Sequence, residues 1–365
     1  MNLDGAMNAK AEAFEEAFGY REIVRSAVLN DSGPLFAPPE GSSTLKEIAR
    51  HRKERKPDPR DLIALGVLRP SGHNRDPAKL RIGIFLQQKR LSDHPIVEKV
   101  QGIAKGESKT IVTGPAERRG ATNGGRCRPL RIGASIGHHR ITAGTLACFA
   151  SNRNGGGIGL LSNNHVLADI NSGRSGDPIL QPARSDGGDR KNPDYHVANL
   201  QRFVPINFNL GSINLVDCAF AYLVDGVERD TGTVYDPQND APLWRVGEME
   251  DLLYGGLPVK KVGRTTGYTD GIVEAVAIDN LNVNMTLGAS PKMARFDRQI
   301  AISGNGKSFS KKGDSGSLIF AEGGRPAALL FAGTERGGAG NHGITYANPI
   351  ATVLQELEVD IYIGA

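Results

Sequence analysis

Residues 311–320 read KKGDSGSLIF, a serine set between glycines that runs directly into an apolar strand. Gly313 and Gly316 allow the backbone to turn sharply, so the hydroxyl of Ser315 can project clear of the chain. In such a turn the N–H groups of Gly313 and Ser315 point toward a common position, where they would stabilise a developing oxyanion. The stretch therefore predicts a nucleophile beside an oxyanion hole, at the start of a buried strand.

A serine hydroxyl is a weak nucleophile, so it needs a base, and the base needs an acid that orients it. The histidine in a strand-like apolar setting is His165, within residues 157–168, GIGLLSNNHVLA. Between this histidine and the serine lies Asp217, which opens the alternating apolar segment DCAFAYL. We expect His165 to take the proton of Ser315 and to return it to a leaving amine, and Asp217 to hold the imidazole tautomer.

The order His165, Asp217, Ser315, together with the local patterns His-Val-Leu, Asp-x-Ala and Gly-Asp-Ser-Gly, resembles the trypsin-like (chymotrypsin-fold) serine peptidases. The resemblance covers residues 129–365 and extends to a bacterial cytoplasmic subgroup and, more remotely, to plant Narrow-leaf-type peptidases. It implies a serine endopeptidase that works through an acyl-enzyme intermediate and processes a specific protein partner. It also favours Asp217 over the nearby Asp225 and makes Asp314 a brace of the oxyanion loop.

The expected fold is mainly β: two six-stranded antiparallel β-barrels with a C-terminal helix, preceded by a helical and small α/β N-terminal region. The 46 glycines and the 6% aromatic content agree with many tight turns between short strands. The expected units are a helical region at 1–60, an α/β module at 61–114, a linker at 115–128 and the peptidase-like body at 129–365. Within that body we place barrel one at about 129–225, barrel two at about 255–347 and the helix at 349–358.

Periodicity and capping patterns place individual elements. A helix is expected at 8–29, in which Phe14 and Phe18 are four residues apart. A second helix is expected at 44–55, because Thr44 and Glu47 form a capping-box pattern at its start. Asn348 is the expected N-cap of the C-terminal helix. The expected strands are 62–68, 80–86, 110–112, 143–150, 158–162, 197–200, 257–262, 271–278, 296–302 and 327–333.

The resemblance also locates a substrate pocket. It places Phe309, six residues before the nucleophile, at the pocket floor, and it makes Phe331, Ala332 and Gly333 the facing wall and the edge that pairs with the substrate backbone. No acid stands at the floor position, so we expect an apolar or small substrate side chain rather than a basic one.

Other chemistries fit the sequence less well. His138, His139 and His342 have no further ligand at metal spacing, so neither a metal nor a cofactor is expected. Residues 313–317 nearly match the Gly-x-Ser-x-Gly pattern of α/β-hydrolases, but that fold places its acid and histidine after the serine, where too few residues remain. Cleavage that frees Ile111 or Ile132 to fold back onto Asp314 remains an alternative route to activation.

Charged residues and cysteines indicate which binding partners and which cellular compartment to expect. The basic run RHRKERK at 50–56 ends a predicted helix and complements its dipole. It lacks aromatic residues that could stack on bases, so we do not expect nucleic acid as a partner. Cys127, Cys148 and Cys218 cannot all pair, which favours a reducing compartment. Without an apolar leader or an 18-residue apolar run, we expect a cytoplasmic protein with no membrane span. Its partners are a protein or peptide substrate and a possible protein at the N-terminal region. The alternative is a binding or scaffold protein on the same fold whose role does not need catalysis.

Overall fold

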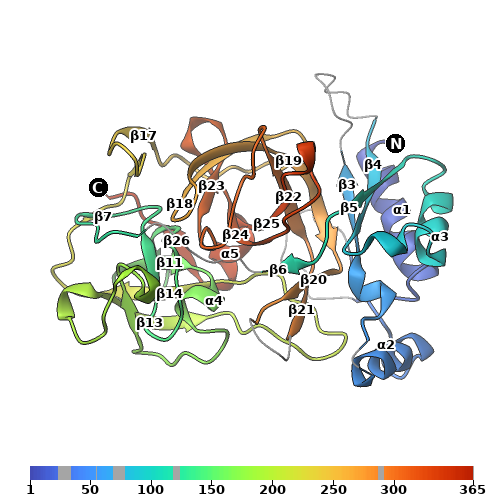
Figure 1. Cartoon of the computed structure of the whole chain (residues 1–365), viewed down its shortest axis with the longest axis horizontal. Coiled ribbons are helices and arrows are strands. Elements are labelled where there is room, and N and C mark those ends of the chain that lie inside the picture. The colour runs from blue at the N-terminus through green and yellow to red at the C-terminus, as the bar shows by residue number, and fades with distance from the viewer. Residues whose placement is uncertain (24–33, 55, 69–78, 118–123, 287–291, 365) are drawn as a thin grey trace.

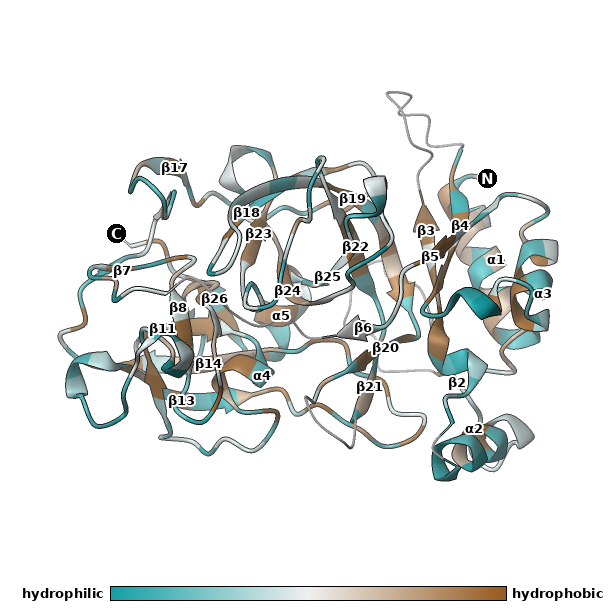
Figure 2. Cartoon of the chain, viewed as in Figure 1, coloured by the Kyte–Doolittle hydropathy of each residue, from teal (hydrophilic) through white to brown (hydrophobic). Residues whose placement is uncertain are grey.

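The computed structural model describes residues 1–23, 34–54, 56–68, 79–117, 124–286 and 292–364. Three units lie in a row in Figure 1: a sheet that contains the green strands, a barrel of orange and red strands in the middle, and a blue N-terminal layer at the far end. The apolar residues gather on the strands, whereas helix α2 (Ser43–Lys53) is largely hydrophilic and buries only Ile48 (Figure 2).

The central unit is a closed ring of six antiparallel strands. Around the ring, each strand pairs with the next and the last pairs with the first: β18 (Pro258–Gly263), β19 (Gly267–Asp279), β22 (Gln299–Gly304), β25 (Thr345–Pro349), β24 (Pro326–Gly333) and β23 (Leu318–Phe320). Alternate residues fill its interior, among them Val259, Val273, Ile302 and Leu330. The six-stranded barrel expected in the C-terminal half is therefore present and closed.

The sheet at the other end is not the six-stranded barrel that we expected. It has eight antiparallel strands and, in the pairings of the described residues, it curls without closing. In spatial order they are β26 (Val359–Ile361), β10 (Cys148–Asn152), β11 (Ile158–Ser162), β14 (Ala219–Leu223), β13 (His196–Phe203), β12 (Pro178–Leu180), β8 (Ser135–His138) and β9 (Gly144–Thr145). The C-terminal strand β26 pairs with β10 and so covers an edge that would otherwise expose unpaired backbone groups.

The N-terminal region adds strands to the central barrel rather than standing apart as two units. Strand β3 (Ile63–Leu68) pairs with β19 on one edge and with β4 (Arg81–Leu86) on the other, and β4 pairs in parallel with β5 (Ser108–Val112). Helices α1 (Leu3–Glu16) and α3 (Pro95–Ile103) contribute Phe14 and Val97 to one buried cluster with Leu65 of β3 and Ile84 of β4. The predicted helical region and α/β module therefore share one core.

The remaining described strands and α-helices are short. They are β1 (Arg21–Ile23), β2 (Leu35–Ala37), β6 (Ala116–Glu117), β7 (Leu130–Arg131), α4 (Asn164–Leu167), β15 (Arg229–Asp230), β16 (Thr233–Tyr235), β17 (Pro242–Arg245), β20 (Leu281–Asn284), β21 (Met293–Phe296) and α5 (Ile350–Glu356). Strand β6 lies within the segment that we expected to be a linker.

Two N-terminal helix predictions need correction. The helix expected at 8–29 begins at Leu3 and ends at Glu16, because Gly19 adopts a left-handed φ of 69° and Tyr20 donates its N–H back to the carbonyl of Phe14 at 2.9 Å. Ile23 lies in β1, and Val24 and Val28 fall outside the described residues. The cap of α2 is Ser42, whose Oγ accepts from the Leu45 N–H at 3.1 Å, and not Thr44.

Other boundaries differ where the backbone breaks the alternation. The strand expected at 143–150 is two strands, β9 and β10. The strand expected at 296–302 is split between β21 and β22 because Arg298 adopts a φ of 63°. The C-terminal helix expected at 349–358 spans only residues 350–356, and Glu358 adopts a left-handed φ of 49° before β26. Strand β11 has the predicted bounds.

Candidate active site

His165 and Asp217 lie next to each other because their strands are paired. Strand β11 pairs with β14 so that Ser162 is opposite Ala219, and the two side chains project from the segments just beyond this pair. The imidazole Nδ1 of His165 lies 2.5 Å from Asp217 Oδ2, and the His165 N–H donates to Asp217 Oδ1 at 3.2 Å. Asp217 thus holds both the imidazole ring and the backbone N–H of His165. The ring nitrogen Nε2 points away from Asp217.

Asp217 is completely buried and is held from both the eight-stranded sheet and the central barrel. Its N–H donates to the side-chain oxygen of Asn348 on β25 at 3.0 Å, and its carbonyl accepts from the side-chain amide of Asn163 at 2.8 Å. Asn348 in turn donates to Gln299 Oε1 at 2.6 Å. The prediction that Asn348 caps the C-terminal helix is therefore wrong, because its amide is used to position Asp217.

Ser315 reaches the same junction from the central barrel. Its carbonyl accepts from the Thr145 N–H at 2.8 Å, and the Thr145 hydroxyl donates to the Gly313 carbonyl at 2.8 Å. Gly144 is tightly enclosed: a Cβ there would lie 2.4 Å from the side chain of Val166 and 3.0 Å from the Ser315 carbonyl. The neighbour of His165 and the backbone of Ser315 thus both lie against Gly144.

The serine and the histidine are not joined by a hydrogen bond in this conformation. Ser315 Oγ donates to the carbonyl of Phe331 at 3.4 Å, and within the described part of the chain His165 Nε2 has no hydrogen-bond partner. Catalytic hydrogen bonds are often formed only when substrate is bound. Ser315 is completely buried and His165 is 3% exposed, so the site is closed to solvent.

The turn before Ser315 is fixed by Asp314. Its Oδ1 accepts from the N–H groups of Thr265 and Thr266 at 2.8 and 3.1 Å, and its Oδ2 accepts from the Thr266 hydroxyl at 2.7 Å and the Lys311 N–H at 2.9 Å. Gly313 adopts a φ of 101°, a conformation that other residues rarely take. A preorganised pair of N–H groups at Gly313 and Ser315 would depend on this brace.

Lys261 is a residue of this site that the sequence analysis does not identify. Its ammonium is completely buried 3.5 Å from Asp314 Oδ2 and donates to Thr266 Oγ1 at 2.5 Å. Burial lowers the pKa of Lys261, and the negative charge of Asp314 opposes that shift. The available signal was its inward position in β18, two residues after the buried Val259.

The ammonium of Lys261 supplies the positive charge next to Asp314 that a new N-terminus would supply after cleavage. The two candidate termini are engaged elsewhere: Ile111 lies in β5, paired with β4, and Ile132 is 3% exposed in the buried cluster of the eight-stranded sheet. Asp314 therefore has a cation partner without any cleavage.

The predicted pocket residues fall in two places. Phe309 packs inside the central barrel with Val273 and Ile302, and its carbonyl accepts from the Thr269 hydroxyl at 2.8 Å. Phe331 and Ala332 belong to a different buried cluster, in which the Phe331 ring lies 4.7 Å from that of Phe296. Gly333 ends β24, and the main chain of β6 lies opposite it.

The remaining candidate residues serve local structure. His138 is buried and contacts Asp177 Oδ2 through Nε2 at 3.0 Å, and its ring lies 4.3 Å from that of His139. The carbonyl of His342 accepts from Ser308 Oγ at 2.7 Å. The three cysteines are free thiols, and burial raises the pKa of Cys148 to about 12.

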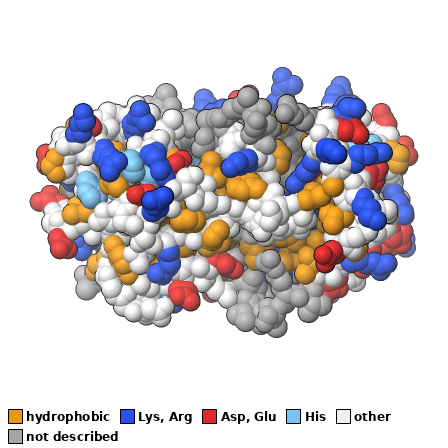
Figure 3. All heavy atoms as spheres, turned by 90° about the horizontal axis from the view of Figure 1, so that it is seen from below, with side chains coloured by type: hydrophobic (Ala, Val, Ile, Leu, Met, Phe, Trp, Pro, Cys, Tyr) orange, Lys and Arg blue, Asp and Glu red, His pale blue; other side chains and the backbone are white. Residues whose placement is uncertain are grey.

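The distribution of surface charge and the described helices are relevant to nucleic-acid and membrane partners. Figure 3 shows Lys and Arg side chains at both ends of one face, interspersed with Asp and Glu, rather than gathered in one basic patch. In the predicted basic run, His51 and Arg52 on α2 contact Asp58 and Asp61 at 3.1 and 3.7 Å. No described helix is long and apolar enough to cross a membrane.

Comparison with known proteins gives distant likenesses. No protein-family model matches the chain. Protein NARROW LEAF 1 of Oryza sativa subsp. japonica is 27% identical over 252 residues, which cover 63% of this chain and 42% of that protein, so the chain spans less than half of its length.

Among solved structures, similar chains include Thermobifida fusca Protease A, 16% identical with a TM-score of 0.44, and a glutamic acid-specific serine protease, 21% identical with a TM-score of 0.45. Each match covers 64% of this chain and 100% of the other. Both of these similar chains are proteases.

Proposed function

We propose that this chain is a serine endopeptidase in which Ser315 attacks a peptide carbonyl, His165 transfers the proton and Asp217 orients His165. The observation that carries the proposal is the buried contact of His165 Nδ1 with Asp217 Oδ2 at 2.5 Å, which leaves Nε2 unpartnered among the described residues. Val166, which follows His165, and the Ser315 carbonyl both lie against Gly144. A carboxylate at Nδ1 fixes the tautomer in which Nε2 can accept a proton.

In the proposed reaction, Ser315 Oγ bonds to the carbonyl carbon while its proton passes to His165 Nε2. The oxyanion that forms is stabilised by the N–H groups of Gly313 and Ser315. His165 then protonates the leaving amine, and water releases the acyl group by the reverse proton path. The substrate is a protein or peptide, and the three free cysteines suit a reducing compartment such as the cytoplasm.

Active-site labelling tests this function. A small fluorophosphonate should label the full-length protein, and Ser315→Ala and His165→Ala should abolish labelling and hydrolysis of fluorescein-labelled casein. Asp217→Asn should lower kcat by about 10⁴-fold, because the histidine would take the wrong tautomer. His138→Ala is the matched control, since His138 is also buried but lies against Asp177. Undiminished labelling of Ser315→Ala would remove the proposal.

A second candidate is a binding or scaffold protein on the same fold. The complete burial of Ser315 favours it, because a nucleophile in solvent-free surroundings cannot meet a peptide without rearrangement. A Ser315→Ala protein that retains its full biological activity in cells would support the scaffold role and contradict the catalytic one.

A further inference from the structure

Strand β6 lies on the edge of β24 that faces Ser315. It is antiparallel to β24, with Glu117 opposite Gly333, and parallel to β20, with Glu117 opposite Asn284. The other edge of β24 is occupied by β25, which places Thr345 opposite Gly333. Because a strand has only two hydrogen-bonding edges, β6 must take the edge that β24 shares with β23.

The same edge carries the turn of the candidate nucleophile. The Gly316 N–H donates to the Leu330 carbonyl at 2.8 Å, and the Phe331 carbonyl accepts from Ser315 Oγ at 3.4 Å. Along β24 the order is therefore β23, the Ser315 turn and then β6. An extended peptide that presents a carbonyl to Ser315 while adding to this edge would lie against residues 331–333, and its backbone would overlap β6.

The direction of β6 strengthens the overlap. Because β6 is antiparallel to β24, the step from Ala116 to Glu117 leads from the end of β24 toward Phe331 and Ser315. Figure 1 shows β6 at the end of the chain segment that follows β5, beside β20. The N-terminal region thus delivers a short strand to the mouth of the candidate site.

The segment before β6 is firmly held. Thr113 is 1% exposed, and its N–H donates to the Leu86 carbonyl at 2.8 Å. Gly337 lies directly against it, because a Cβ at Gly337 would be 3.1 Å from the Thr113 Cα. Val112 and Thr113 therefore lie between β4 and the loop that follows β24.

We propose that β6 holds the place of a substrate backbone on β24, so that the N-terminal region inhibits the enzyme in cis and an extended polypeptide binds when β6 leaves. This inference rests on the proposed serine endopeptidase function. It accounts for a nucleophile that is completely buried in a site built to receive a peptide. The occupant that competes with β6 is recognised by its main chain, as in strand addition.

The first test loosens β6. The double variant Ala116→Pro/Glu117→Pro removes both backbone N–H groups, whichever of them faces β24. We expect the KM for fluorescein-labelled casein to fall by about 2- to 10-fold with kcat unchanged, because the open fraction rises as backbone hydrogen bonds are lost. The matched control Ala116→Ser/Glu117→Gln keeps both N–H groups and should behave as the wild type.

The second test locks β6 in place without altering β24. Glu117→Cys/Asn284→Cys would join opposed positions of β6 and β20, in a Cys127→Ser background that removes the most exposed native thiol. The oxidised protein should lose casein hydrolysis, and reduction should restore it. Each single cysteine variant should be insensitive to oxidation.

Prolonged fluorophosphonate labelling of the reduced proteins separates the two ideas, since this small probe needs no strand edge. If every protein is labelled but casein hydrolysis is unchanged by the prolines and by the lock, inhibition in cis is wrong and the enzyme function stands. If the prolines abolish hydrolysis while labelling and the thermal midpoint persist, β6 builds the substrate site, and the proposal is overturned. If no protein is labelled, the function itself fails.

Discussion

Asp314 and Lys261 form a charged pair beneath the Ser315 turn, and both side chains are completely buried. Removing one partner of such a pair leaves an uncompensated charge away from water, which costs more than the pair contributes. The four hydrogen bonds to Asp314 shape the turn, and Lys261 balances the charge that this shape requires.

Replacing Lys261 should therefore affect both stability and the oxyanion turn. We expect Lys261→Met to lower the free energy of unfolding by about 3 kcal/mol or more and to slow the labelling of Ser315. The control is Lys260→Met, the preceding residue, whose ammonium lies over the Trp244 ring at 4.3 Å and is worth about 0.5–1 kcal/mol. Equal urea midpoints for the two variants would contradict this role.

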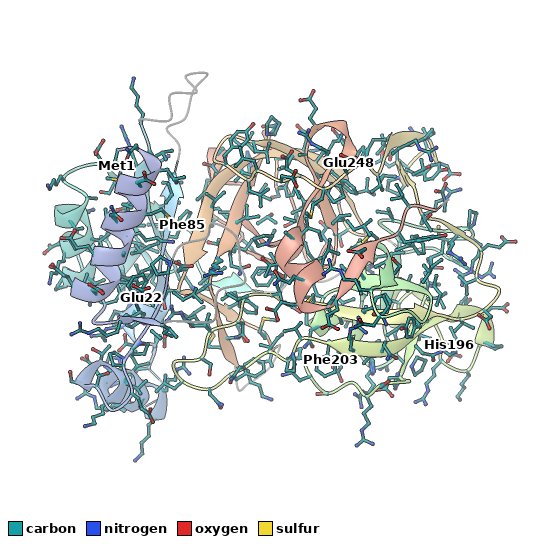
Figure 4. The ribbon with its side chains drawn as sticks, turned by 180° about the vertical axis from the view of Figure 1, so that it is seen from behind. Met1, Glu22, Phe85, His196, Phe203 and Glu248 are labelled. Carbon is teal, nitrogen blue, oxygen red and sulfur yellow. The ribbon has the colours of Figure 1, made fainter. Side chains whose placement is uncertain are left out.

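At the scale of elements, the N-terminal region is joined to the central barrel by buried polar contacts as well as by β3. Lys10 on α1 is 2% exposed and donates to Asp279 Oδ2 at 2.8 Å and to the Ala277 carbonyl at 2.6 Å. Asn280 donates to the Ile63 carbonyl at 2.8 Å. Phe85 lies where the N-terminal layer meets the barrel in Figure 4, and it shares a buried cluster with Ile278.

Because Lys10 makes these buried contacts, we expect its replacement to destabilise the fold strongly. Lys10→Met should lower the free energy of unfolding by about 3–5 kcal/mol, because Asp279 would lose its buried cation. Chemical denaturation followed by circular dichroism measures the change. Lys46→Met on α2 is the control, because Lys46 is exposed and should shift the midpoint little. A Lys10→Met protein as stable as this control would show that α1 is only loosely attached.

At the scale of the whole molecule, buried histidine sets part of the pH dependence of stability. His138 in β8 is completely buried, its Nδ1 accepts from the Arg140 N–H at 3.2 Å and its Nε2 contacts Asp177. Burial lowers the pKa of His138 below its ordinary 6.5, and the hydrogen bond with Asp177 only partly opposes that shift. His138 therefore binds a proton more readily in the unfolded chain than in the folded chain.

The sign follows from that difference in proton binding. The contribution of a neutral, buried His138 is fully present above pH 6.5 and is lost as the pH falls toward its lowered pKa. The thermal midpoint of the wild type should be lower at pH 5.5 than at pH 7.5. The thermal midpoint of His138→Gln should fall less between these two pH values. An identical acid loss in both proteins would mean that His138 titrates normally.

The sequence alone identified the features that are encoded locally. The apolar run after the glycine-rich turn at 152–157 predicts β11 with its observed bounds. The glycines around Ser315 predict a turn in which Gly313 and Gly316 adopt left-handed φ values of 101° and 91°. His165 and Asp217 were chosen from short patterns, and the structure brings their side chains into contact. Turn geometry and strand alternation depend on neighbouring residues, so a single sequence carries them.

Only the tertiary structure decided which distant segments meet. Asn348 is predicted to cap a helix but supports Asp217. Lys261 belongs to no predicted site but neutralises Asp314. Residues 116–117 fall in the predicted linker, but Glu117 pairs with Gly333. The edge strand β26, which makes the first sheet eight-stranded, is another such case. The physical reason is that each role depends on a partner brought near by sheet registration, and local propensity carries no information about that partner.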